Sequence, residues 1–79
     1  MESEILEYLE ETYQAKIFDI ELISKDEYKT NYNIKIKDLI FKYTYAKNYT
    51  FDYNMLYLKS QVNKMITRFK IKGVKLKWK

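Results

Sequence analysis

Residues 31–45, which read Asn-Tyr-Asn-Ile-Lys-Ile-Lys-Asp-Leu-Ile-Phe-Lys-Tyr-Thr-Tyr, decide the fold of this chain. Apolar and polar residues alternate as far as position 37, as is typical of a half-buried strand, and the apolar set is Tyr32, Ile34 and Ile36. At Asp38 the alternation shifts by one residue, and the apolar set becomes Leu39, Phe41, Tyr43 and Tyr45. Because such a shift would turn every side chain to the other face, Lys37-Asp38 forms either a hairpin turn or a β-bulge. We favour the hairpin, since each half is long enough for a strand.

Regular patterns precede this stretch. Ser3 is placed to cap a helix over residues 4–14, whose apolar face consists of Ile5, Leu6, Leu9 and Tyr13. Residues 16–24 then alternate as a half-buried strand with Phe18, Ile20 and Leu22 on one face. Residues 25–27, which are all charged, are expected to form the turn to the next strand.

A second helix is predicted after the strands, over residues 51–69 with Thr50 as its cap. Its apolar residues recur at 4-3 spacing, widened by Leu56 and Ile66: Phe51, Met55, Leu58, Val62, Met65 and Phe69. This spacing fits both the seam of a parallel homodimer and the packing of the helix on the sheet. We favour core packing, because a chain of 79 residues needs these side chains inside.

Beyond Gly73, apolar residues alternate with lysines and indicate a short final strand or a basic tail over about residues 70–79, with Val74, Leu76 and Trp78 as the apolar set. The predicted fold is therefore a single α+β domain spanning residues 1–79. Its order is α-β-β-β-α-β, and two helices pack on an antiparallel sheet.

The amino-acid composition excludes many classes of function. The chain has no Cys, no His and one Gly, so it lacks thiol nucleophiles, the commonest general base and metal ligand, and any glycine-rich phosphate loop. We therefore expect a non-enzymatic protein without a cofactor or metal. The N-terminal stretch is acidic and amphipathic, unlike a signal peptide, and no apolar run is long enough to span a membrane. A cytoplasmic location is expected, which would be the host cytoplasm if the protein is viral.

Charge is distributed unevenly along the chain. Residues 1–27 carry nine acids and two lysines, a net charge of −7, whereas residues 28–79 carry thirteen bases and two acids, a net charge of +11. A basic, tyrosine-rich segment is typical of nucleic-acid or nucleoprotein binding, although lysines also protect edge strands from aggregation. We predict that aromatic and basic residues of this half contact nucleic acid: Tyr53, Tyr57, Lys64, Arg68, Lys70, Lys72, Lys75 and Lys77.

An alternative function places the interface on the first helix. Its exposed face would carry Glu4, Glu7, Glu10 and Glu11. Such a face could bind a basic protein or remain a solvated surface. The Lys-, Ile-, Tyr- and Asn-rich composition is common in small accessory proteins of phages and other mobile elements. The alternative is therefore an inhibitor of a host protein, such as a CRISPR nuclease or a replication factor.

Two resemblances rest on the order of elements. Helix–strand–strand–strand–helix resembles the double-stranded-RNA-binding domain, but residues 50–53 stand where that family carries a lysine cluster, so no residue role is carried over. The full order also resembles the PD-(D/E)xK nuclease core, with Asp19 and the Glu27-Tyr28-Lys29 triplet in the places of its acid and ExK motif. That resemblance implies Mg²⁺-dependent cleavage, a distant third reading, because the triplet falls in a predicted turn.

Overall fold

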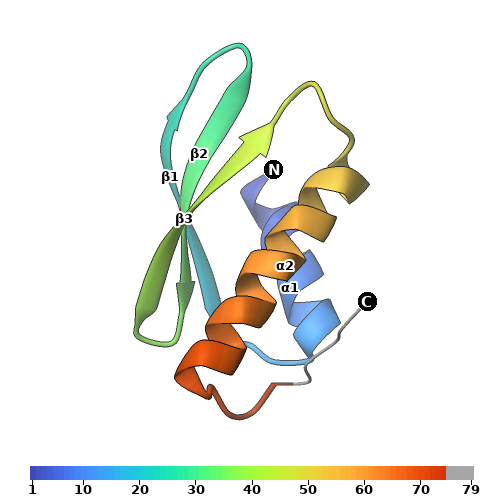
Figure 1. Ribbon diagram of the computed structural model, residues 1–79. Helices are drawn as coiled ribbons and strands as arrows, with labels where there is room; N and C mark the ends of the chain where they lie inside the picture. The colour runs from blue at the N-terminus through green and yellow to red at the C-terminus, as the bar shows by residue number, and fades with distance from the viewer. Residues whose placement is uncertain (75–79) are drawn as a thin grey trace.

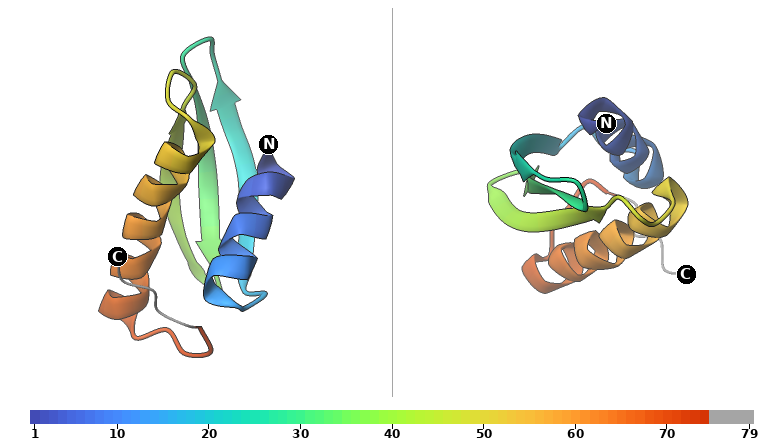
Figure 2. Two further views of the ribbon diagram at one scale, coloured as in Figure 1. Left: turned by 90° about the vertical axis from the view of Figure 1, so that its right-hand side faces the viewer. Right: turned by 90° about the horizontal axis from the view of Figure 1, so that it is seen from above.

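Two helices lie against one face of a three-stranded antiparallel sheet in the computed structural model, which describes residues 1–74 (Figure 1). The elements follow one another as α1 (Glu2–Tyr13), β1 (Phe18–Lys25), β2 (Lys29–Ile36), β3 (Leu39–Ala46) and α2 (Phe51–Phe69). The strands lie in the order β1-β2-β3, so β1 and β3 form the edges. Figure 2 shows α1 and α2 on the same face of the sheet, with the other face open. The predicted α+β class is confirmed.

The predicted final strand falls largely on residues 75–79, which lie outside the described residues. Residues 70–74 follow α2 as turn and irregular backbone. The described order is therefore α-β-β-β-α, the order on which the resemblance to the double-stranded-RNA-binding domain rests.

The alternation shift at Lys37-Asp38 is a hairpin turn, as predicted. Ile36 pairs with Leu39, so two residues form the loop between β2 and β3. Lys37 has a φ of 54°, in the left-handed region that two-residue hairpins use and that L-residues adopt at a cost. The apolar sets of the two strands then share the face beneath the helices, where Tyr32, Ile34, Ile36, Tyr43 and Tyr45 are buried.

Substitution of Lys37 by glycine should therefore stabilise the protein. Glycine adopts a positive φ without the cost that lysine carries, although its greater freedom in the unfolded chain offsets part of the gain. We expect the free energy of unfolding in urea to rise by up to about 1 kcal/mol. Lys35→Gly is the control, because Lys35 lies in β2 next to the turn and is exposed, and it should destabilise by about 0.5–1 kcal/mol. Equal destabilisation by both changes would contradict the turn assignment.

The predicted cap of the first helix is wrong. The helix begins at Glu2, and Ser3 lies inside its first turn. The reason is that the Ile5 N–H donates to the Met1 carbonyl at 3.1 Å, which extends the helix past the position where a Ser3 cap would end it. The apolar face was predicted correctly, since Ile5, Leu9 and Tyr13 are fully buried.

The second helix begins and packs largely as expected. The Thr50 hydroxyl accepts the Tyr53 N–H at 3.1 Å and so caps α2. Most of the 4-3 stripe lies in the protein's own core, which favours core packing over a dimer seam: Met55, Leu58, Val62 and Ile66 are buried. The inclusion of Leu56 in that stripe is wrong, because it lies about 100° around the helix from Met55 and is 60% exposed. Phe69, the last residue of α2, is also half exposed.

Burial decreases along β1 towards its turn. Phe18 is buried, Ile20 is half-buried and Leu22 is 41% exposed. Figure 1 gives the reason: the β1–β2 hairpin projects beyond the ends of both helices. The Asp26 carboxylate holds the turn by accepting the N–H groups of Tyr28 and Lys29 at 2.7 and 2.9 Å. These two bonds lower the pKa of Asp26.

Two buried asparagines fix α2 against the rest of the fold. Asn54 accepts the Ala46 N–H at 2.8 Å and donates to the Ala46 carbonyl at 2.9 Å, so it pairs with the free edge of β3. Asn63 accepts the Tyr13 hydroxyl at 2.6 Å and so joins α2 to α1. Neither role was predicted, although both asparagines flank the apolar stripe. Asn54 thus holds the start of α2 beside β3, and Asn63 holds the middle of α2 beside α1.

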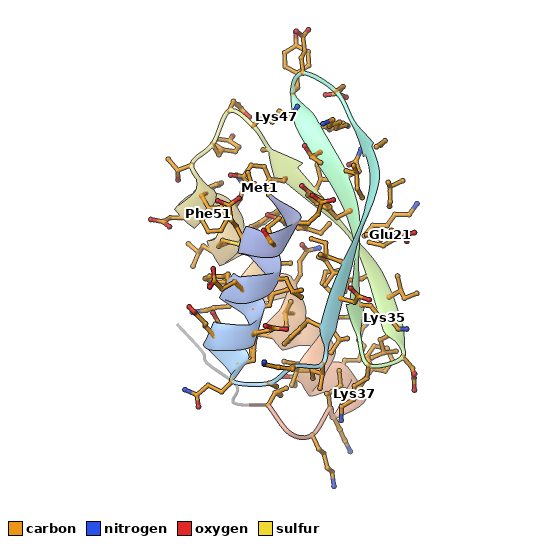
Figure 3. All side chains as sticks on the ribbon, turned by 180° about the vertical axis from the view of Figure 1, so that it is seen from behind. Met1, Glu21, Lys35, Lys37, Lys47 and Phe51 are labelled. Atoms are coloured by element: carbon orange, nitrogen blue, oxygen red, sulfur yellow. The ribbon has the colours of Figure 1, made fainter. Side chains whose placement is uncertain are left out.

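The open face of the sheet is largely polar, although Ile40 is 61% exposed there opposite Lys35. Asn31 donates to the Ser24 hydroxyl and accepts from the Thr44 hydroxyl, so one hydrogen-bonded row crosses all three strands. Figure 3 shows Glu21 and Lys35 pointing away from the helices on this face. Acidic and basic side chains are mixed there, as in an ordinary solvated sheet surface.

Candidate nucleic-acid interface

A shallow groove runs between the edge strand β3 and α2. The bonds between Asn54 and Ala46 join the start of α2 to the end of β3, so the helix then returns along the strand. The groove has a volume of about 290 Å³ and is lined by Phe41 and Lys42 of β3 and by Gln61, Lys64, Met65 and Arg68 of α2. Phe41 and Met65 pack against the core and form its floor. The floor is therefore apolar, and the remaining lining residues are polar or basic.

Three cations surround this groove. Lys42, Lys64 and Arg68 are exposed, and none of them forms an ion pair with a carboxylate of residues 1–74. Lys64 and Arg68 stand four residues apart on α2, where like charges repel by about 0.2–0.5 kcal/mol. No Asp or Glu is among the lining residues. The groove therefore offers uncompensated positive charge to an anion.

Aromatic side chains continue this side of the helix towards its start. Tyr53 is 53% exposed and Tyr57 is 67% exposed. Tyr49, just before the Thr50 cap, is also 53% exposed, and its ring centroid lies 4.7 Å from that of Tyr53. Leu56, misassigned to the core, lies beside them on the exposed face. We call Tyr49, Tyr53 and Tyr57 the tyrosine row.

The structure places the predicted nucleic-acid-binding residues in three groups. Lys64 and Arg68 line the groove, whereas Tyr53 and Tyr57 belong to the tyrosine row. Lys70 and Lys72 are exposed in the segment after α2, where the Lys72 carbonyl accepts the Lys37 ammonium at 3.0 Å. Lys75 and Lys77 lie outside the described residues.

Sequence reasoning missed Lys42 and Tyr49. The alternation of residues 39–45 places Lys42 on the outward side of its strand, but it does not show that this strand is the edge beside α2. Tyr49 precedes the helix and so lay outside the helical pattern. The spacing of four residues between Tyr49 and Tyr53 could have indicated that the two rings are neighbours.

The glutamates of the alternative interface lie on a different part of the molecule. Glu4, Glu7 and Glu11 are exposed on α1, and Glu10 is half-buried. Three of them, Glu7, Glu10 and Glu11, line a shallow hollow with Gln14 at the end of that helix. The acids thus gather on α1 while the cations of the groove lie on α2 and β3. Partner binding by the acidic helix stays a prediction.

The residues of the nuclease resemblance are not brought together. Asp19 lies near the start of β1, and Glu27 lies in the turn beyond the end of that strand. The strand from Asp19 to its end at Lys25 alone spans about 20 Å. Within residues 1–74, no three carboxylates converge in an arrangement that could hold a metal ion.

Comparison with known proteins identifies no relative of this chain. Neither the protein-family models, nor the curated proteins, nor the solved structures give a match to this chain. Neither of the two helices found in residues 1–74 is long and apolar enough to cross a membrane.

Proposed function

We propose that the protein is a non-enzymatic binding module that contacts nucleic acid, alone or in a nucleoprotein, through the groove between β3 and α2. One observation carries this proposal: Lys42, Lys64 and Arg68 converge on one groove from two elements, without a carboxylate partner in residues 1–74. Cations that neutralise phosphates release counterions, and this release drives nucleic-acid binding.

A polymer suits this surface better than an isolated anion. Lys70 and Lys72 extend the positive charge beyond the end of α2. From Tyr53 to Arg68, the outer side of α2 spans about 22 Å at 1.5 Å per residue. An elongated surface with separated cations matches the repeating charge of a phosphate backbone.

The double variant Lys42→Glu/Lys64→Glu tests the proposal. At about 50 mM salt, where counterion release favours binding, we expect the wild-type protein to bind DNA or RNA oligonucleotides measurably by fluorescence anisotropy. The variant should bind at least about tenfold more weakly, and the slope of log K against log salt should fall by about two, one for each lost phosphate contact. On α2 the new glutamate would stand four residues before Arg68, a favourable spacing for an ion pair, so the fold should be retained.

The control is Lys16→Glu/Lys35→Glu, which changes the same charge at exposed sites away from the groove. Each reversal removes two units of positive charge, so both double variants have a formal net charge of 0 instead of +4. Equal weakening by both variants would show that net charge alone governs binding and would contradict a site in the groove. Undetectable binding by the wild-type protein at this salt concentration would refute the proposed function.

A further inference from the structure

We propose, on the premise that the groove binds nucleic acid, that the ligand is single-stranded and that its unpaired bases stack on the tyrosine row. Stacking of bases on aromatic side chains beside a basic groove is the general means by which single strands are held without sequence preference. The proposal therefore assigns the phosphates to the groove and the bases to the first half of α2.

The positions of the residues place both surfaces on one side of the helix. Tyr53 and Tyr57 are spaced by four residues, which corresponds to about 6 Å along the helix axis, and the Tyr49 ring lies 4.7 Å from that of Tyr53. Gln61 follows at the same spacing and already lines the groove. Lys64 and Arg68 continue in the same direction. A strand lying along α2 would meet aromatic rings first and cations next, while Asp52, an exposed acid in the first turn, lies about 100° around the helix from Tyr53.

The exposure of the tyrosine row also favours a ligand that covers these rings. Its three rings are each more than half exposed, and Leu56 beside them is 60% exposed. Scattered exposed apolar residues are ordinary on protein surfaces, but here three of them lie on the first half of α2 and Tyr49, just before the helix, packs its ring against Tyr53. The adjoining positive charge favours an anionic occupant over a neutral one. A nucleotide combines the flat apolar face of its base with a negatively charged phosphate, so it matches both features.

A duplex would leave the tyrosine row unused. The bases of a double helix stack on one another, so their faces are closed to a ring that approaches from outside. Duplexes are instead recognised through phosphates, sugars and groove edges. Three exposed rings in a row next to the groove are therefore accounted for by unpaired bases.

The test compares single-stranded and duplex oligonucleotides of one mixed sequence, about 16 nucleotides long, the upper end of the site sizes of single-strand-binding folds. DNA and RNA versions of these oligonucleotides show which of the two polymers the protein binds more tightly. The wild-type protein should bind the single strand at least about tenfold more tightly than the duplex. Tyr53→Ala/Tyr57→Ala should weaken single-strand binding by about tenfold or more and leave duplex binding and the salt slope unchanged.

Matched single variants control for the loss of an exposed ring. Tyr57 is 67% exposed on α2, and Tyr28 is 72% exposed at the tip of the β1–β2 hairpin. Tyr57→Ala should weaken single-strand binding, whereas Tyr28→Ala should not. Alanine suits a helix, and both side chains lie outside the core, so both variants should fold.

The outcomes separate this inference from the proposed function. Wild-type affinity that is equal for duplex and single strand, or unchanged by loss of the rings, would overturn the inference while the groove variants still weaken binding. Absence of binding to both forms would overturn both proposals and favour a protein partner for the exposed patch.

Discussion

Replacement of Asn54 by alanine should lower the free energy of unfolding by about 2–3 kcal/mol. Asn54 is only 4% exposed, and its side-chain oxygen is the hydrogen-bond acceptor for the Ala46 N–H. Without it, that donor lies unpaired at the end of β3. The carbonyls of Ala46 and Thr50 would each lose one bond, but they keep a second donor, from the N–H groups of Tyr49 and Asn54 respectively. One orphaned donor and two lost bonds therefore account for the expected loss.

Urea unfolding measures this effect, and two further variants interpret it. Asn54→Asp keeps an acceptor for the Ala46 N–H but buries a carboxylate oxygen against the Ala46 and Thr50 carbonyls, so its loss at neutral pH should be at least as large as that of the alanine variant. Asn48→Ala makes the same chemical change at an exposed loop position and should shift stability by no more than about 0.5 kcal/mol. A loss below about 1 kcal/mol for Asn54→Ala would contradict the role assigned to this residue.

Asn54 also links stability to the groove. It attaches the start of α2 to the end of β3, and the groove lies further along the same two elements. If α2 shifts when this attachment is lost, Lys64 and Arg68 move relative to Lys42. The alanine variant would then combine a stability defect with a changed arrangement of the three cations, so the exposed charge variants are the better test of binding.

The strands and their turn could be predicted because the alternation of apolar residues has a strict period of two. The shift of the apolar alternation at Asp38 was compatible with a hairpin or with a bulge. The pairing of Ile36 with Leu39 and the burial of both apolar sets beneath the helices identify it as a hairpin. Periodicity cannot distinguish neighbours at the edge of a helical stripe. Leu56 was therefore assigned to the core although it is exposed on the outer side of α2.

Only the part of the candidate site that lies on a single helix could be predicted from the sequence. Lys64 and Arg68 share a helix side, so their spacing alone places them together. Lys42 joins them because β3 is the edge strand beside α2, which depends on tertiary arrangement. The buried asparagines were missed for a similar reason. A polar residue beside an apolar stripe is normally solvated, and only the partner groups at Ala46 and Tyr13 make its burial favourable.

Alkaline pH should unfold this protein steeply, through two buried tyrosines. Tyr13 is fully buried and Tyr43 is 2% exposed. The Tyr13 hydroxyl donates to Asn63 Oδ1 at 2.6 Å, and the Tyr43 hydroxyl donates to the Asn54 carbonyl at 2.9 Å. Burial disfavours the phenolate and raises the pKa of both tyrosines far above 10. Burial also raises the pKa of Tyr32 and Tyr45.

The direction of the pH effect follows from which state holds the protons. In the unfolded chain tyrosine loses its proton near pH 10, while in the folded protein Tyr13 and Tyr43 keep theirs. Above pH 10 the folded state therefore binds more protons, and the stability that is fully present below pH 10 declines as the pH rises. Each tyrosine contributes a slope of about 1.4 kcal/mol per pH unit, so the pair could remove about 4 kcal/mol or more by pH 12.

Unfolding in urea at a series of pH values between 8 and 12 measures this slope. Tyr13→Phe and Tyr43→Phe should each reduce the slope of the unfolding free energy against pH by about 1.4 kcal/mol per pH unit, which is the contribution of one titrating proton. They should also lower stability at neutral pH by about 1 kcal/mol through the lost hydrogen bond. Tyr57→Phe, at an exposed position, should leave the slope as in the wild-type protein. If the buried substitutions left the slope unchanged, ionisation of these two tyrosines could not be the cause of alkaline unfolding. Because Tyr43 donates to Asn54 and Tyr13 to Asn63, the same titration would remove one hydrogen bond between β3 and α2 and one between α1 and α2.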